Sequence, residues 1–164
     1  MDKPSSAKPK LAIKTLLSPV SGESKGLESH PNILIAKGLQ GKGVHISPLS
    51  SRIVAPCKAK VVNISAIGHQ ITLACGHDLI VEIVIGHEPL KHHGLGFNRC
   101  VKVGDIVNAG QVLVELDLIA LNKLLEEVVV AMLVSKGAVK LTPYLGNMRA
   151  GEDEIMQLII KAQE

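Results

Sequence analysis

The stretch GHQITLACGHDLIVEIVIGHE, residues 68–88, places aliphatic residues at alternate positions on either side of a Gly-His pair. Alternation with a period of two is the pattern of a half-buried β-strand, and Gly followed by another residue is a common two-residue hairpin turn. The stretch therefore predicts two antiparallel strands joined by a tight turn at Gly76 and His77.

A two-residue turn at this point fixes which residues of the two strands face each other. His69 is expected opposite Val84, and Ile71 opposite Glu82. Because successive side chains on a strand point to opposite faces, all four are expected on one face of the sheet. The predicted hairpin thus presents a histidine directly across from a valine.

Short aliphatic runs bounded by glycine and proline continue on both sides of this hairpin. Runs of about four to eight residues rich in Val and Ile, separated by such turn signals, are typical of β-sandwiches and barrels. The other runs of this kind are LAIKTLLSP, PNILIAKG, GVHISP, SRIVAP, AKVVNISAIG, RCVKVGD and GQVLVELD. We expect an all-β fold, an antiparallel β-sandwich or barrel-sandwich.

Two further patterns refine this architecture. The segment LIALNKLLEEVVV, residues 118–130, has leucines at three- and four-residue spacing and predicts a helix at one edge or end, in a fold with one or two short helices. The stretch GDIVNAGQVLVELD from Gly104 recurs loosely from Gly146 as GNMRAGEDEIMQLI. A repeated turn followed by a strand predicts two similar halves of a sandwich.

Length and composition indicate one domain without a nucleic-acid partner. The chain has 164 residues, of which 46% are hydrophobic, enough for one core. Residues 1–10 are expected to form a flexible tail and residues 11–164 a single domain. The net charge of +3 forms no basic stripe, and with one Phe, one Tyr and no Trp the chain lacks aromatic platforms for stacking bases.

The cysteines and the apolar runs bear on the cellular compartment. Cys57, Cys75 and Cys100 are odd in number and lack the paired spacing of zinc sites, so we expect small, buried, reduced thiols and a cytoplasmic protein. No apolar run reaches the roughly 18 residues of a membrane span. We therefore expect a protein that is not embedded in a membrane.

Several segments together resemble one known family. They are SPVSGE, PNILIAKGLQGKGVHISP, IVAPCKAKVVNI, GHQITL, IVIG, GLGF, GQVLVELDL and GNMRAGEDEI. In order and spacing they are similar to the glucose-type enzyme IIA component of the bacterial phosphoenolpyruvate-dependent sugar phosphotransferase system, over roughly residues 11–162. The resemblance implies an antiparallel β-sandwich that carries a phosphoryl group from a phosphohistidine carrier protein to the cysteine of a sugar-specific, membrane-associated domain.

The resemblance also implies roles for two positions. In that family two histidines lie on adjacent strands; the second is the nucleophile, and the first hydrogen-bonds the phosphoryl group. The supporting histidine is then His69, and the nucleophile position is Val84. An isopropyl group has no lone pair with which to attack phosphorus, so Val84 cannot carry a phosphoryl group. Whether the chain has any phosphotransferase activity is therefore open.

The surroundings of this position differ from the family as well. Glu82 stands where the family has an apolar, partner-facing residue, and its charge would repel an incoming phosphoryl group. Ile67 replaces a hydroxyl that would orient the supporting imidazole. These changes predict a degenerate family member that binds without transferring, as a regulatory module.

A binding module of this kind needs a partner surface. The partner-binding residues that we expect are Ile33, Leu34, Ile35, Ile71 and Glu82. The expected partners are the phosphocarrier protein and a sugar-specific permease domain, or regulated metabolic and transport proteins. No cofactor is expected.

Two alternatives stay open. A working phosphocarrier would use His69 or His87 in phosphoenolpyruvate-dependent sugar uptake, although residues 87 and 84 have opposite parity on a strand. A metal-binding β-sandwich would use the loop HEPLKHH, since imidazoles suit zinc or nickel. Its candidate ligands are His87, Glu88, His92 and His93, whose spacing matches no recognised metal site.

Overall fold

The computed structural model describes residues 10–86, 96–124 and 127–162. Antiparallel strands make up most of this part of the chain, which confirms the all-β expectation. The largest sheet, called here the large sheet, has eight strands in the order β13-β2-β3-β11-β7-β6-β5-β9. These strands are β2 (Gly22–Gly26), β3 (Lys42–Pro48), β5 (Ala59–Ile64), β6 (Gln70–Ala74), β7 (Ile80–Ile85), β9 (Ile106–Val107), β11 (Val130–Lys136) and β13 (Gly146–Met148).

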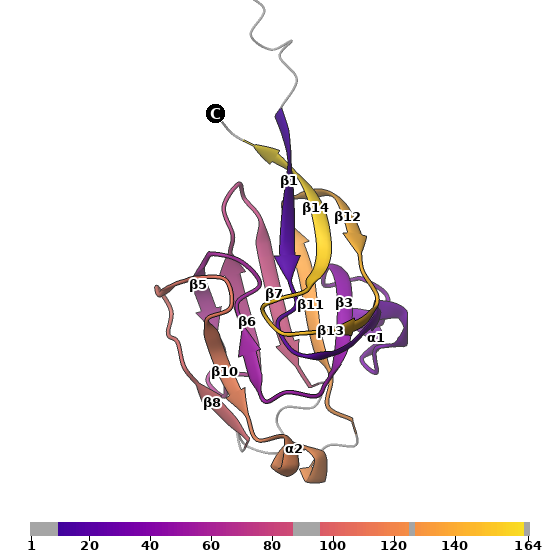
Figure 1. The fold of residues 1–164 in the computed structure, drawn as a ribbon, viewed down its shortest axis with the longest axis vertical. Helices are drawn as coiled ribbons and strands as arrows, with labels where there is room; N and C mark the ends of the chain where they lie inside the picture. Colours follow the sequence, from indigo (N-terminus) through magenta and orange to yellow (C-terminus); the bar gives the residue numbers. More distant parts are fainter. Residues whose placement is uncertain (1–9, 87–95, 125–126, 163–164) are drawn as a thin grey trace, which may run out of the picture.

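Two three-stranded sheets complete the sandwich, in the orders β1-β14-β12 and β4-β10-β8. Their strands are β1 (Lys10–Leu17), β12 (Ala138–Pro143), β14 (Glu154–Ala162), β4 (Arg52–Val54), β8 (Phe97–Arg99) and β10 (Val112–Leu116). The short helical elements are η2 (Leu27–Ser29), α1 (Ile33–Ala36) and α2 (Leu118–Leu124). Figure 1 shows α1 at one side of the molecule near β3, and α2 at the end below β8 and β10.

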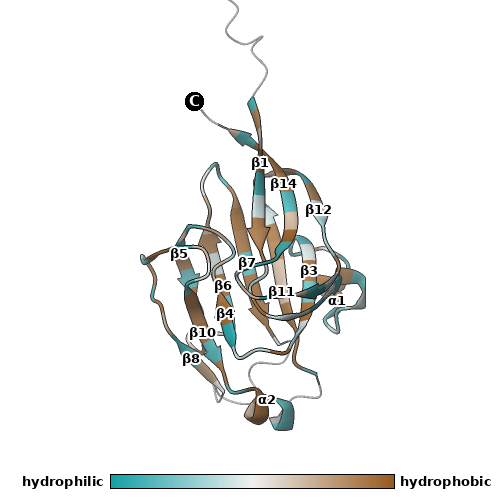
Figure 2. Ribbon diagram, viewed as in Figure 1, coloured by the Kyte–Doolittle hydropathy of each residue, from teal (hydrophilic) through white to brown (hydrophobic). Residues whose placement is uncertain are grey.

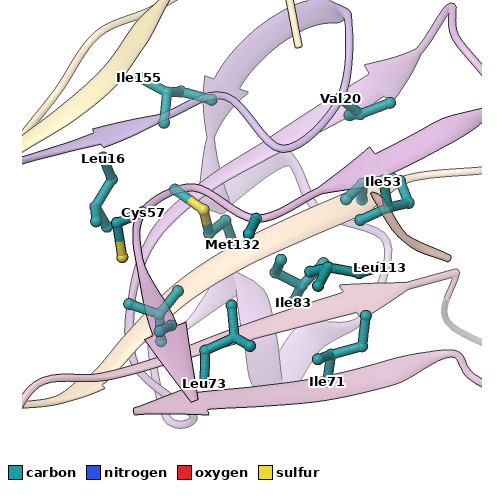
Figure 3. Close-up of a cluster of buried hydrophobic side chains, with 14 of the residues drawn as sticks. Leu16, Val20, Ile53, Cys57, Ile71, Leu73, Ile83, Leu113, Met132 and Ile155 are labelled. Atoms are coloured by element: carbon teal, nitrogen blue, oxygen red, sulfur yellow. The ribbon is translucent and has the colours of Figure 1, made fainter. Parts of the chain in front are cut away.

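The core between the sheets is aliphatic and draws on all three of them. Figure 2 shows β7 and β10 coloured as hydrophobic along most of their length. Figure 3 shows part of the buried cluster, to which the large sheet contributes Ile83, the β4 sheet Ile53 and the β1 sheet Leu16. Chains of this length can bury about two thirds of their unfolded surface, so one such core is sufficient.

The internal repeat corresponds to equivalent places in the two halves of the sandwich. The repeat from Gly104 contains β9 and β10, and the repeat from Gly146 contains β13 and β14. The first strands, β9 and β13, lie at opposite edges of the large sheet, whereas β10 and β14 are each the central strand of a three-stranded sheet. The prediction of two similar halves is confirmed.

The hairpin of β6 and β7 has a longer turn than the sequence predicted. Gly76, His77 and Asp78 all have positive φ, at 84°, 51° and 61°. The Cys75 N–H donates to the Leu79 carbonyl at 2.9 Å, so the loop between these two residues holds three residues rather than two. Asp and His tolerate the left-handed region better than most side chains, which permits this turn.

The extra turn residue shifts the strand register by one. Gln70 pairs with Val84, Ile71 with Ile83, and Thr72 with Glu82. A shift of one residue moves a strand's side chains to the other face. The predicted pairing of His69 with Val84 and of Ile71 with Glu82 is therefore wrong. Ile71 is 0% exposed in the core, so its predicted role in partner binding is wrong too.

Three local predictions also need correction. The run PNILIAKG forms α1 instead of a strand, because the Asn32 side chain accepts from the Leu34 N–H at 2.9 Å and caps a helical turn. The helix predicted over residues 118–130 ends at Leu124, and Val130 already begins β11, where a β-branched residue packs well. Cys57 and Cys75 are buried as expected, whereas Cys100 is exposed.

No helix in the described ranges is both long and apolar enough to cross a lipid bilayer.

Candidate functional site

Val84 belongs to a row of residues that crosses the large sheet on the face opposite the main core, called here the outer face. Lys25, His45, Ala131, Val84 and Gln70 are paired in turn along β2, β3, β11, β7 and β6. Directly opposed residues share a face of a sheet. The position that the family resemblance assigns to the nucleophile therefore lies on the outer face, near the middle of the large sheet.

A small hydrophobic cluster occupies the outer face beside this position. The cluster consists of Leu27, Ile35, Ala131 and Leu133, and the half-buried Val84 packs against it. The isopropyl group is thus part of a continuous apolar surface that extends from β7 across β11 to η2 and α1. The side chain at position 84 has a packing role here and brings no polar atom to the face.

His69 lies directly before β6, next to the end of β7. Its carbonyl oxygen accepts from the Ile85 N–H at 2.7 Å, and its side chain is half-buried. The Ser65 hydroxyl lies 2.9 Å from His69 Nδ1, and the same oxygen accepts from the Gln70 N–H at 3.1 Å. The imidazole is therefore oriented through Nδ1 by the Ser65 hydroxyl.

Ser65 is a site residue that the sequence analysis missed. The substitution at Ile67 had indicated that no hydroxyl orients the histidine, but Ser65 supplies one. The loop between β5 and β6 folds back so that the Ser65 N–H donates to the Gln70 carbonyl at 2.9 Å. This turn brings the hydroxyl to the imidazole, and its only sequence signal is a serine four residues before the histidine.

A carboxylate lies on the same face as Val84, two residues earlier on β7. Glu82 is half-buried, and its Oε1 accepts from Gln70 Nε2 at 3.4 Å. Gln70 is in turn the direct cross-strand neighbour of Val84. The vicinity of position 84 thus combines an apolar side chain, an amide and a negative charge, a combination that disfavours a phosphoryl group.

The predicted partner residues Ile33, Leu34 and Ile35, called here the apolar rim, lie on the single turn of α1, and only two of them are exposed. Ile33 is 63% exposed and Leu34 50%, so both are available to a partner. Ile35 is 2% exposed and packs in the outer-face cluster, which makes its predicted role as a contact residue wrong. Leu39, which is 70% exposed and follows α1, adds apolar surface that the sequence analysis did not include.

Two buried histidines beneath η2 and α1 were also missed. His30 and His45 are 5% and 2% exposed, and their rings meet edge to face with centroids 5.4 Å apart. His30 Nδ1 accepts from the Asn32 N–H at 2.9 Å, and His45 Nε2 lies 2.7 Å from the Ser29 hydroxyl. The pair connects the rim-bearing segment to β3, although neither residue stood out in the sequence.

The environment of His45 predicts a pH-dependent stability. Burial, and then the positive charge of Lys25, lower its pKa, while the charges of Glu127 and Glu28 and a backbone hydrogen bond to Gly26 act in the opposite direction. In the unfolded chain the His45 side chain binds its proton near pH 6.5, and in the folded chain it binds the proton only at a lower pH. The free energy of unfolding should be steady above about pH 6.5 and should fall as the pH drops below it, by up to about 1.4 kcal/mol per pH unit.

Urea unfolding at several pH values between 5 and 8 measures this effect. His45→Gln should flatten the part of the slope that is due to this group, whereas His77→Gln, a change at an exposed turn residue, should leave that part in place. Equal slopes in the wild type and in the His45 variant would contradict the prediction.

The candidate metal ligands His87, Glu88, His92 and His93 lie outside the described residues, as does His87 in its role as an alternative phosphoryl acceptor. Within residues 10–86, 96–124 and 127–162 no group of three or more His, Cys, Asp or Glu side chains is placed to hold a metal ion.

Comparisons with known proteins agree with the fold and with the resemblance. The family model described as phosphoenolpyruvate-dependent sugar phosphotransferase system, EIIA 1, matches residues 14–139. The PTS system glucose-specific EIIA component of Oceanobacillus iheyensis is 26% identical over 152 residues, which cover 88% of this chain and 90% of the relative. The corresponding component of Borreliella burgdorferi is 29% identical over 126 residues, which cover 77% of this chain and 67% of the relative.

Similarity also extends to a larger protein and to a solved structure. The PTS system beta-glucoside-specific EIIBCA component of Dickeya chrysanthemi is 36% identical over 104 residues, which cover 63% of this chain and 16% of that protein. The structure of glucose permease IIA from Mycoplasma capricolum matches with a TM-score of 0.84 and 22% identity, over 89% of this chain and 96% of that chain. At that identity the structural match shows a shared fold.

Proposed function

Because this chain belongs to the EIIA 1 family of the phosphoenolpyruvate-dependent sugar phosphotransferase system, we propose that it is a glucose-type EIIA-like module that binds its partners without carrying a phosphoryl group at position 84. Val84 is the observation that carries this proposal. Phosphoryl transfer to a side chain requires a lone pair in line with phosphorus. An isopropyl group lacks one at every pH, and here it packs against Ala131 and Leu133.

The charge around position 84 supports binding in preference to transfer. Glu82 shares the outer face with Val84, and Gln70 Nε2 donates to it. A phosphorylated partner that approached this face would bring like charge toward the carboxylate, at a cost of about 1 kcal/mol in water and more where solvent is excluded. The module should therefore prefer the unphosphorylated form of its partner.

One observation favours a second candidate function, a phosphocarrier that uses His69. The Ser65 hydroxyl lies 2.9 Å from His69 Nδ1 and orients the imidazole, a side chain that can act as a nucleophile toward phosphorus. In this alternative His69 is itself the nucleophile. The two functions differ in one measurable product, an acid-labile phosphohistidine. No described residue cluster supports the metal-binding alternative.

The proposed partner surface is the exposed part of the apolar rim. Ile33 and Leu34 face outward from α1, and Leu39 follows them on the same segment. Large apolar side chains exposed together are typical of protein interfaces. The partners we propose are the phosphocarrier protein and a sugar-specific permease domain, or regulated metabolic and transport proteins, in the cytoplasm.

Titration of the protein with the unphosphorylated phosphocarrier protein tests this proposal. Ile33→Glu should weaken binding by at least about tenfold, because it places a charge in the contact surface. Ile106→Glu is the matched control, since Ile106 is 60% exposed against 63% for Ile33 but lies on β9, at the far edge of the large sheet. Failure of the wild type to bind, or equal losses in both variants, would contradict the proposed surface.

A further inference from the structure

Two of the three cysteines lie side by side inside the molecule. Cys57 and Cys75 are 7% and 4% exposed, and their thiols hydrogen-bond each other. Cys57 precedes β5 and Cys75 follows β6, which are paired with Lys60 opposite Ala74. Figure 3 shows the Cys57 sulfur in the buried cluster, at the end where Leu16 lies. This register places Cys75 next to the level of Ala59, two residues from Cys57, so both cysteines lie at the same end of the β5–β6 pair.

A pocket of about 570 Å³ gives small molecules a route to Cys57. Cys57 contributes to its lining, together with Lys14 and Lys58. The Lys14 ammonium also donates to the Cys75 carbonyl oxygen at 3.0 Å, so a positive charge is held beside the thiols. A cation next to a cysteine favours its thiolate form, which is the nucleophilic form.

The hydrogen bond between the thiols makes the two sulfurs unequal. The hydrogen bond with Cys75 lowers the pKa of Cys57, with a further contribution from Lys14 that opposes the effect of burial. The same hydrogen bond, together with burial, raises the pKa of Cys75. Cys57 is therefore the attacking sulfur and Cys75 the one that resolves the reaction. A thiolate beside a second thiol is the arrangement found in redox-sensitive cysteine pairs.

We propose that Cys57 and Cys75 form a reversible redox-active dithiol, which a small two-electron oxidant of the peroxide class converts into a disulfide. The Cys57 thiolate attacks one peroxide oxygen, which breaks the O–O bond, leaves a sulfenic acid and, after protonation, releases one water. The Cys75 sulfur then attacks Cys57, forming the S–S bond, and a second water leaves with the Cys75 proton. Two thiols are oxidised and one peroxide is reduced to two waters.

The disulfide would join the start of β5 to the end of β6 and close the loop of residues 57–75. A cross-link of that length restricts the unfolded chain and raises the midpoint of thermal unfolding, here by about 5–10 °C. Reduction by a dithiol should return both sulfurs to the free state and remove the increase in the midpoint.

The experiment uses the full chain with Cys100→Ser, which removes the exposed thiol and leaves only the buried pair. The folded protein is treated with hydrogen peroxide, quenched, unfolded in acid and then alkylated before intact-mass measurement. We expect a product that has lost two hydrogen atoms and takes up no alkylating groups, with a raised thermal midpoint that dithiothreitol reverses. Cys57→Ser in the same background should retain one alkylatable thiol and show no such product.

Two results would overturn the proposal. One is uptake of two alkylating groups after peroxide treatment that oxidises a reactive reference dithiol in the same tube. The other is a disulfide that joins two chains instead of the two sulfurs of one chain, detected as a dimer mass that disappears on reduction. Neither result bears on position 84, so the outcome is independent of the proposed binding function.

Discussion

Val84→His is expected to convert a chain that takes up no phosphoryl group into one that forms an acid-labile phosphohistidine when incubated with phosphoenolpyruvate, enzyme I and the phosphocarrier protein. The change supplies the missing lone pair at the position that the family resemblance assigns to the nucleophile. Position 84 is half-buried on the outer face, so a side chain there can meet a docked partner. Labelling should rise from undetectable to a large fraction of one phosphoryl group per chain.

The residues around position 84 predict how further substitutions change the labelling of the Val84→His variant. His69 lies beside the end of β7 and is held by Ser65, and the family resemblance assigns it the supporting role. Glu82 opposes an incoming negative charge, and Glu82→Gln combined with Val84→His should raise the labelling rate by about tenfold. His69→Ala in the Val84→His background should reduce the yield, because it removes the imidazole to which the family resemblance assigns the stabilisation of the phosphoryl group.

Intact mass at neutral and acidic pH gives the readout, with a known EIIA protein labelled in the same tube as the positive control. Labelling of the wild type that disappears in His69→Ala or in His87→Ala would establish a relocated nucleophile and replace the binding function with the carrier function. If Val84→His stays unlabelled while the control is labelled, the loss of transfer does not rest on position 84 alone.

Gly43→Ala is expected to destabilise the protein by about 3 kcal/mol or more, which lowers the midpoint of thermal unfolding by roughly 6–12 °C. Gly43 lies on β3 opposite Leu133 of β11, and a Cβ atom there would overlap the Met132 carbonyl oxygen. That oxygen belongs to the backbone of a neighbouring strand, so the strands must separate to make room. Leu133 also belongs to the outer-face cluster against which Val84 packs.

Gly26→Ala is the matched control for this change. Gly26 also has a negative φ, of −65°, but the atoms nearest to a Cβ there are those of the Glu28 carboxyl group. Because a flexible exposed side chain can turn away, the cost should stay within about 1 kcal/mol. Thermal and urea unfolding of both variants measure the difference. Similar stability losses in the two variants would show that the close approach of β3 and β11 does not limit residue size at Gly43.

The hairpin of β6 and β7 shows which features a sequence pattern predicts and which it does not. The alternation of aliphatic residues correctly predicted two antiparallel strands, because a half-buried strand requires a period of two. The strand register depends on whether the turn holds two residues or three. Asp78, in the left-handed region, is the third turn residue. That single residue moved Ile71 to the core and made Gln70 the neighbour of Val84.

At the candidate site, the sequence shows which chemical groups are present, whereas the tertiary structure decides where they lie. The absence of a nucleophile at Val84 is a property of the side chain itself, so the sequence was sufficient to detect it. The hydroxyl that holds His69 comes from Ser65, and its role depends on a turn between β5 and β6. The burial of Ile35 depends on the direction in which one helical turn points.

The sequence by itself determined the all-β class, the internal repeat, the family and the absence of a nucleophilic group from the side chain at position 84, because periodicity, composition and the identity of a functional group are local properties. Only the tertiary structure decided which residues share the outer face, which histidines are buried beneath α1, and that Cys57 and Cys75 meet. These are contacts between segments far apart in the chain, fixed by turn length and strand register rather than by any local pattern.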